Sequence, residues 1–173
     1  MIKKIESAIR DIPDFPKPGI IFKDITPVLQ DAELFKAVID LLAENCSENK
    51  PDYIVGLDAR GFILGAPLAA KLGCGFIPIR KKDKLPFTTI SRSYELEYGE
   101  ATLEIHQDAL KEGDKVVIVD DLLATGGTIS AAVELVKNLG GEILSIEFLM
   151  ELCFLNGKEK IKNEKFNSLI CVN

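Results

Sequence analysis

The run V-V-I-V-D-D-L-L-A-T-G-G-T, from Val116 to Thr128, constrains the fold of this chain more than any other segment. Its first four residues are β-branched and apolar, which predicts a strand buried on both faces of a parallel sheet. Two carboxylates and a short loop with two glycines follow. Apolar residues between Ile129 and Val136 then recur at helical spacing. We therefore expect a strand, a loop and a helix in succession, with the carboxylates at the carboxyl end of the strand.

The same alternation of strand and helix continues through the middle of the chain and predicts an α/β fold. We expect a mostly parallel, twisted sheet with helices on both faces and right-handed crossovers. The expected elements are helices at about 31–46 (capped by Asp31), 62–72 and after 128, and strands at 53–57, 75–79, 94–105 (two), 116–119 and 142–149.

The two chain ends do not fit this alternation. Residues 2–9 have helical spacing and precede a proline-rich loop, and the last twenty residues read as irregular. We expect a single domain, residues 1–173, with a core at about 31–150 and a small hood built from about 1–30 and 151–173.

Charge and hydropathy exclude some classes of partner. The net charge is −6, whereas nucleic-acid-binding proteins usually carry a basic face. No apolar stretch approaches the roughly 20 residues that span a bilayer, and the first ten residues lack the apolar core of a signal peptide. We expect a cytoplasmic protein with neither nucleic acid nor membrane as a partner.

The cysteines and the histidine do not form a metal-binding pattern. Cys46, Cys74, Cys153 and Cys171 are far apart in the sequence, and His106 is the only histidine. Zinc sites usually show such residues at tight spacing. We expect four reduced thiols and no metal ion held directly by the protein.

The loop after the central strand has the chemistry of a phosphate site. Ligands of open α/β sheets bind at the carboxyl ends of the strands. Small residues let backbone amides surround an anion, and a helix amino terminus adds partial positive charge. The alternative is a tight turn with a helix cap at Thr128, since Asp and Gly pairs are common in turns. The lysine of a P-loop and a G-x-G-x-x-G pattern are both absent, so the carboxylates beside the loop favour a sugar phosphate.

Two further segments have a functional and a structural interpretation. Arg60, in G-L-D-A-R-G-F-I-L-G at 56–65, could clamp a pyrophosphate or form a surface salt bridge. The basic run R-K-K-D-K-L-P at 80–86 could begin a mobile lid, about 80–99, or form a solvated face.

The run at 116–128 resembles the phosphoribosyl pyrophosphate motif of type I phosphoribosyltransferases. F-P-K-P-G-I-I-F-K-D-I-T-P, L-E-Y-G followed by L-E-I-H, and E-L-C-F-L-N-G, in this order, resemble the adenine-specific branch of that family. The resemblance covers the chain from about 15 to 157. It implies that Asp120 and Asp121 contact the ribose hydroxyls. The residues implied to bind the 5′-phosphate are Ala124, Thr125, Gly126, Gly127 and Thr128.

The resemblance also assigns the pyrophosphate end of the substrate. Asp58, Ala59 and Arg60 match the pyrophosphate loop, and Arg80, Lys84 and Tyr98 are implied to contact phosphoribosyl pyrophosphate, with Arg80 reaching a neighbouring site in a homodimer. Arg60 and Lys84 would stabilise the leaving group. The family commonly has Pro-Gly where this chain has Lys82 and Asp83, a departure that bears on the stiffness of the lid.

For the purine, the resemblance implies stacking on Phe22, backbone contacts from Ile21 and Lys23, and closure of the other face by Leu152. The alternative is a proline-bounded loop with Phe22 in the core.

Glu97 is implied to manage the proton of the purine imidazole. Without the resemblance, Glu95 and Glu97 read as ordinary exposed strand carboxylates. His106 is discounted as a general base because it lies in a strand-like segment.

The expected activity is that of a pentosyltransferase (a glycosyltransferase) in purine salvage: adenine and 5-phosphoribosyl 1-pyrophosphate (PRPP) give AMP and pyrophosphate. Mg²⁺ is expected as cofactor, held mainly by PRPP and water. One rival is a phosphoribosyltransferase for hypoxanthine, guanine or xanthine. The other is a non-catalytic regulator that senses PRPP.

Overall fold

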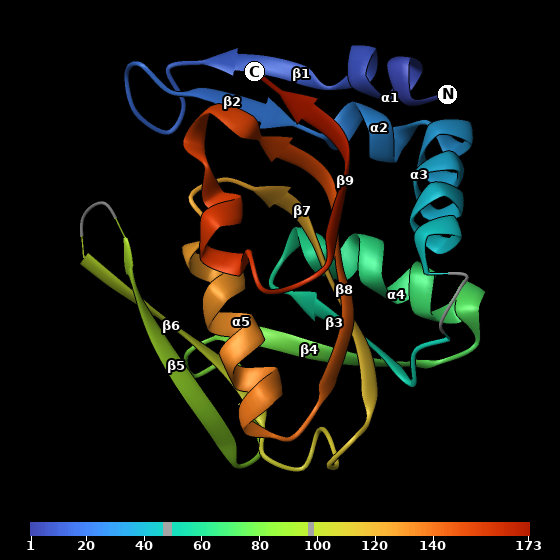
Figure 1. Ribbon diagram of the computed structural model, residues 1–173. Coiled ribbons are helices and arrows are strands. Elements are labelled where there is room, and N and C mark those ends of the chain that lie inside the picture. The colour runs from blue at the N-terminus through green and yellow to red at the C-terminus, as the bar shows by residue number, and fades with distance from the viewer. Residues whose placement is uncertain (47–49, 97–98) are drawn as a thin grey trace. The chain divides into compact units, whose positions relative to one another are not determined.

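The computed structural model describes residues 1–46, 50–96 and 99–173 (Figure 1). The chain divides into two compact units, Met1–Leu41 and Leu42–Asn173. The first unit contains α1 (Ile2–Ala8), β1 (Arg10–Pro13), β2 (Ile21–Asp24), α2 (Thr26–Gln30) and most of α3 (Ala32–Asn45).

Local chemistry explains two features of the first unit. β1 and β2 form an antiparallel pair in which Ile12 lies opposite Phe22. The helix α3 begins where the sequence predicts, because Asp31 Oδ1 accepts hydrogen bonds from the amides of Glu33 and Leu34 at 2.9 and 3.0 Å. Such a cap satisfies amides that have no partner within the helix.

The described part of the second unit contains a seven-stranded sheet in the order β5-β6-β4-β3-β7-β8-β9. Neighbours from β4 to β9 in this order are parallel, and β5 and β6 form an antiparallel hairpin at one edge. This confirms a mostly parallel sheet. The strands are β3 (Tyr53–Leu57), β4 (Gly75–Lys81), β5 (Thr89–Leu96), β6 (Gly99–His106), β7 (Lys115–Leu123), β8 (Glu142–Leu152) and β9 (Phe166–Val172).

The helices α4 (Arg60–Leu72) and α5 (Gly127–Asn138) cover opposite faces of this sheet. Side chains alternate along a strand, so Val55 packs in the cluster that includes Ile129 of α5. On the other face, Gly65 of α4 approaches Ile54 and Phe76. The expected covering of both faces is confirmed. Among the described residues, no helix is both long and apolar enough to cross a membrane.

Several elements extend beyond their predicted ends. β7 continues four residues past Val119 to Leu123, so both aspartates lie within the strand, near its end. β8 continues to Leu152. These extensions include polar or bulky residues that buried-strand periodicity does not capture.

The C-terminal segment is not irregular, and that prediction was wrong. After two short 3₁₀ helices, η1 (Cys153–Leu155) and η2 (Gly157–Ile161), the chain forms β9, which pairs with β8 along most of its length. Residues 166–172 thus belong to the main sheet, whereas the sequence analysis places 151–173 in the hood. The boundaries of the core, hood and lid stay predictions.

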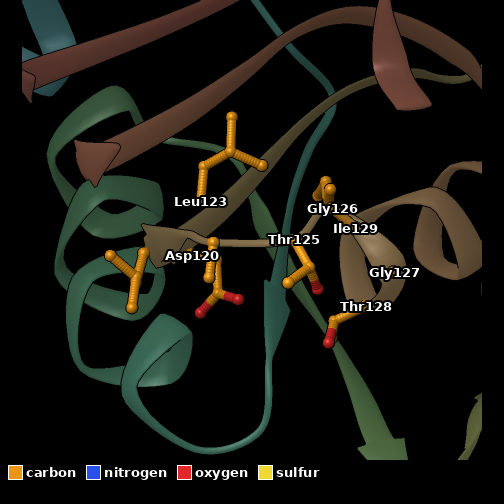
Figure 2. A pocket seen from close by; sticks show the side chains of 9 residues that line it. Asp120, Leu123, Thr125, Gly126, Gly127, Thr128 and Ile129 are labelled. Carbon is orange, nitrogen blue, oxygen red and sulfur yellow. The ribbon is translucent and has the colours of Figure 1, made fainter. Parts of the chain in front are cut away.

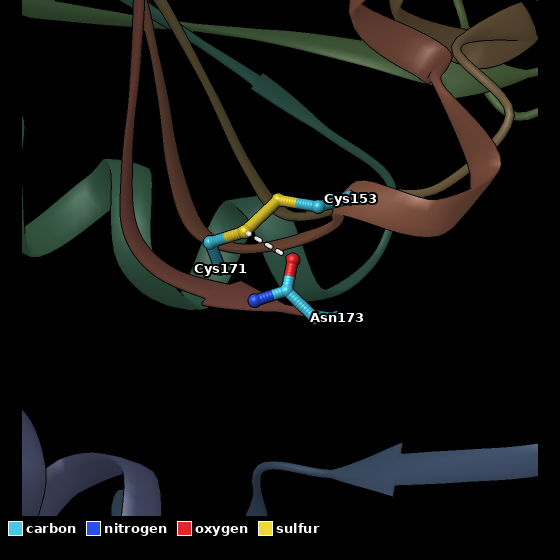
Figure 3. The surroundings of a disulfide bond; sticks show 3 residues. All are labelled: Cys153, Cys171 and Asn173. Atoms are coloured by element: carbon cyan, nitrogen blue, oxygen red, sulfur yellow. Dashed lines mark hydrogen bonds between the residues drawn. A yellow bond between two sulfur atoms is a disulfide. The ribbon is translucent and has the colours of Figure 1, made fainter.

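The expectation of four reduced thiols was also wrong, because Cys153 and Cys171 form a disulfide (Figure 3). The parallel pairing that sets Leu152 beside Val172 brings the two cysteines together, with their Cα atoms 5.9 Å apart. The two cysteines are 18 positions apart in sequence, so spacing gives no sign of the bond. Cys46 and Cys74 are free thiols, and burial raises the pKa of Cys46 to about 12.

Candidate functional site

The loop from Ala124 to Thr128 lies between the end of β7 and the first turn of α5, where it lines a pocket together with Asp120 (Figure 2). Gly126 has a φ of +78°, a left-handed conformation that favours glycine. In Figure 2 the carboxylate of Asp120 and the hydroxyls of Thr125 and Thr128 lie on the same side of the loop. The predicted loop residues therefore line one pocket, and their binding of a phosphate stays a prediction.

The amino terminus of α5 is suited to an anion. Its cap residue, Gly126, has no side chain, and no side-chain hydrogen bond caps the helix. Within the described residues, no side chain at this cap accepts a hydrogen bond from the amides of the first turn of this 12-residue helix. These amides are therefore available to a bound anion. The helix dipole places partial positive charge at the same point.

The two aspartates of β7 differ in their surroundings. Asp121 is buried, with 4% of its surface exposed, and its Oδ2 accepts a charge-assisted hydrogen bond from Arg60 Nε. Its amide donates to Oδ1 of Asp120 at 2.9 Å. Burial, and secondly the neighbouring Asp121 carboxylate, raise the pKa of Asp120 well above its ordinary value.

Arg60 joins two segments that the sequence analysis treats separately. It is the first residue of α4, directly after the peptide bond between Asp58 and Ala59, which is cis. Its guanidinium lies beside the acidic pair and forms a salt bridge with the buried Asp121. Gly61 allows this approach: a Cβ there would lie only 3.0 Å from Oδ1 of Asp120. The contact of Arg60 with pyrophosphate stays a prediction.

Arg80, at the end of β4, links the start of the predicted lid to Asp58 of the predicted pyrophosphate loop. Its Nε donates to Oδ2 of Asp58 at 3.1 Å, and its Nη1 donates to the carbonyl of Lys84 at 3.2 Å. Asp83 has a φ of +64°, and its backbone amide donates a hydrogen bond to the buried carboxylate of Glu104 at 3.1 Å. These bonds bring Asp58, Arg80 and the backbone of Lys84 together within one chain.

Tyr94 of β5 is a contact residue that the sequence analysis missed. Thr128 Oγ1 donates a hydrogen bond to its Oη at 3.2 Å. Its ring lies so close to the loop that a Cβ on Gly127 would be 3.2 Å from Tyr94 Cδ2. Strand periodicity places Tyr94 on a face of the hairpin but does not show which element that face meets.

The residues predicted to bind the purine fall in both units. Ile21, Phe22 and Lys23 form part of β2 in the first unit. The Phe22 ring meets that of Phe15 edge-to-face, with centroids 5.3 Å apart. Leu152 is the half-buried last residue of β8. Their contact with a purine stays a prediction.

Glu97 and Tyr98 lie outside the described residues, so their roles also stay predictions. Glu95, at the end of β5, is exposed. His106 ends β6, where its ring meets that of Phe87 edge-to-face and its Nε2 is buried without a hydrogen-bond partner in the described chain.

No group of three or more His, Cys, Asp or Glu side chains that could hold a metal ion occurs within residues 1–46, 50–96 and 99–173. The carboxylates of the pocket region are the adjacent Asp120 and Asp121, and the second is already paired with Arg60. An ion here would need most of its ligands from a bound molecule and water.

Comparisons with known proteins show the family of this chain. Residues 27–171 match the phosphoribosyl transferase domain family. A curated adenine phosphoribosyltransferase of Clostridium botulinum is 55% identical over 169 residues, which is 98% of each chain. The chain belongs to the adenine phosphoribosyltransferase family.

Solved structures of this family have the same fold. The adenine phosphoribosyltransferase of Thermoanaerobacter pseudethanolicus has a TM-score of 0.97 and 56% identity, covering 99% of this chain and 100% of its own. That of Saccharomyces cerevisiae, solved with an imino-altritol bisphosphate and adenine, has a TM-score of 0.92 and 43% identity over 97% of each chain.

Proposed function

We propose that this chain transfers the 5-phosphoribosyl group of PRPP to adenine, giving AMP and pyrophosphate, as a step of purine salvage. The observation that carries the proposal is the pocket at the end of β7, where the 124–128 loop, an uncapped helix start and the carboxylate of Asp120 meet, with Asp121 as the next residue of the strand. Amides and hydroxyls hold a phosphate that is not transferred, while carboxylates accept hydrogen bonds from ribose hydroxyls. The yeast relative solved with adenine supports the choice of base.

Pyrophosphate departure places negative charge on the far side of the ribose from the 5′-phosphate. Arg60 lies beside Asp121 at the start of α4, and its planar guanidinium suits a bidentate phosphate contact. Arg80 and Lys84 add positive charge where Arg80 already joins the lid to the pyrophosphate loop. These groups lower the barrier by positioning and by electrostatic stabilisation.

Mg²⁺ is part of this proposal, and the donor set fits it. The carboxylate of Asp120 offers hard oxygen donors, which suit an ion that keeps its waters and takes its other ligands from substrate phosphates. When bound, the ion would neutralise pyrophosphate charge. In this chain, Asp120 would hold it or the ribose hydroxyls, since Asp121 is paired with Arg60.

The base end of the reaction rests on the family resemblance. Phe22 would stack on adenine, the backbone of Ile21 and Lys23 would read its edge, and Leu152 would close the other face. Glu97 would accept the imidazole proton as nitrogen attacks the anomeric carbon. A homodimer and a cytoplasmic location complete the proposal; sedimentation of the pure protein tests the first.

A base panel tests the activity. The protein, PRPP and Mg²⁺ are mixed with adenine, hypoxanthine, guanine or xanthine, and released pyrophosphate and the nucleotide are measured. We expect AMP and pyrophosphate in equal amounts from adenine and little product from the other bases. Preference for an oxopurine would reassign the substrate, and no pyrophosphate from any base would favour a non-catalytic PRPP sensor.

The same assay tests Glu97 against a matched neighbour. We expect Glu97→Gln to lower kcat at least about 100-fold, the usual order for loss of a general base, with PRPP binding nearly unchanged. The exposed Glu95→Gln serves as control and should keep normal turnover. Equal turnover of the two variants would remove Glu97 from the mechanism.

A further inference from the structure

The segment that follows β8 contacts the 124–128 loop through the backbone of Gly157. Gly126 is packed against Gly157: a Cβ on Gly126 would lie 3.1 Å from the carbonyl carbon of Gly157 and 3.2 Å from its Cα, and closer still to its oxygen. A Cβ on Gly157 would in turn collide with the carbonyl oxygen of Ala124 and lie 2.9 Å from the amide nitrogen of Gly126. Neither neighbour is a flexible side chain, so neither residue tolerates a methyl group without a shift of backbone.

This contact is held from both sides. Cys153, four residues before Gly157, is tied to β9 by the disulfide. Ile161, four residues after it, is only 2% exposed and packs in the main hydrophobic cluster. The segment also lies beside α5 (Figure 1), and Glu164 forms an ion pair with Lys137 in the last turn of that helix. The backbone of Gly157 is therefore held in place on both sides, and the 124–128 loop packs against it.

We propose that Gly157 is a positioning residue for the 5′-phosphate site: its missing side chain lets the 157 backbone set the path of Ala124 to Gly126 and thereby aim the loop amides at the phosphate. The inference rests on the proposed function. A methyl group at 157 would push the Ala124 carbonyl and the Gly126 amide, and hydrogen bonds to phosphate weaken steeply when a donor is misdirected. The three heavy atoms nearest to a Cβ on Gly157 would belong to Ala124 and Gly126, and none to the predicted pyrophosphate loop at Asp58 to Arg60.

The prediction is a selective loss of affinity for one end of the substrate. We expect Gly157→Ala to weaken ribose 5-phosphate binding at least tenfold by calorimetry, while Mg-pyrophosphate binding changes less than twofold. In steady-state assays, KM for PRPP should rise and kcat should change little. A merely structural role would lower the active fraction and both ligands' binding stoichiometry together.

Gly75→Ala is the matched control. A Cβ there would lie 2.6 Å from Tyr53 Cδ1, a close contact with a side chain instead of with backbone, at the opposite end of the strands. It should lower the Tm as Gly157→Ala does, with both ligands bound normally. Should the two variants show the same ligand profile, the proposal fails.

Two less disruptive substitutions at the neighbouring Asn156 test the same proposal if Gly157→Ala does not fold. Asn156 is exposed and has a φ of +52°, which Asn and Gly accept more readily than Ala. Asn156→Ala should weaken ribose 5-phosphate binding about fivefold, which corresponds to a strain near 1 kcal/mol, and Asn156→Gly should not. Equal binding by these two variants would overturn the inference. Failure of the unsubstituted protein to bind ribose 5-phosphate would instead overturn the proposed function.

Discussion

Asp120 and Asp121 are neighbours in sequence with different electrostatic roles. Asp121 has a fixed cationic partner in Arg60, whereas the pKa of Asp120 is raised by burial and by the charge of Asp121. A desolvated carboxylate beside a second carboxylate destabilises the folded protein at neutral pH, and the charge of Arg60 offsets only part of this cost. Such a cost is expected at a ligand site, because a bound hydroxyl or metal ion offsets it.

Replacing Asp120 by Asn should therefore stabilise the protein while impairing activity. A carboxyl whose folded pKa lies above its unfolded value costs nothing while it is protonated in both states, and the cost grows as pH rises from about 4 towards the folded pKa. At pH 7 we expect Asp120→Asn to raise the Tm by about 2–5 °C. This gain should vanish near pH 4, and turnover should fall at least tenfold.

Thermal unfolding across this pH range checks the prediction. Asp108→Asn, at an exposed position of the chain, is the control and should leave the Tm close to that of the unsubstituted protein at every pH. A lower Tm for Asp120→Asn than for the unsubstituted protein at pH 7 would contradict the assigned environment.

At the scale of elements, the sequence predicts the βα unit better than it predicts what surrounds it. Apolar strands with period-3.6 helices identify β3, α4, β7 and α5, because burial on both faces leaves a clear pattern. The support of the 124–128 loop by Gly157 and Tyr94 could not be predicted, since both contacts depend on which elements meet in space.

The pairing of β9 with β8 also could not be predicted from the sequence pattern. Phe166 to Val172 is short and mixed in polarity, so only its register with β8 makes it a strand. The disulfide depends on that register. In the chain-entropy view, a bond closing a loop of this length stabilises the folded state by about 3 kcal/mol.

Replacing one cysteine of the Cys153–Cys171 disulfide tests whether this bond forms in solution. We expect Cys171→Ser to lower the free energy of unfolding by about 3 kcal/mol without reductant, measured by urea denaturation. In excess dithiol the two proteins should have the same stability. Cys74→Ser removes a free thiol and is the control. Equal stability of Cys171→Ser and the unsubstituted protein without reductant would show that the bond is not formed.

For the whole molecule, the account depends on one correspondence between residues and substrate. The sequence alone places two carboxylates, a glycine loop and a helix start in one segment, and the family resemblance turns these into sites for ribose and phosphate. The structure adds Arg60 beside the acidic pair and the backbone of Gly157 behind the loop. Neither could be predicted from spacing, because their partners are about 60 and 30 residues away in sequence.

A crystal structure of the protein with AMP is the most direct measurement of this correspondence. We expect the 5′-phosphate oxygens to accept hydrogen bonds from the amides between Ala124 and Thr128, with the ribose hydroxyls beside Asp120 and Asp121. A nucleotide bound elsewhere, with the 124–128 loop empty, would contradict the account.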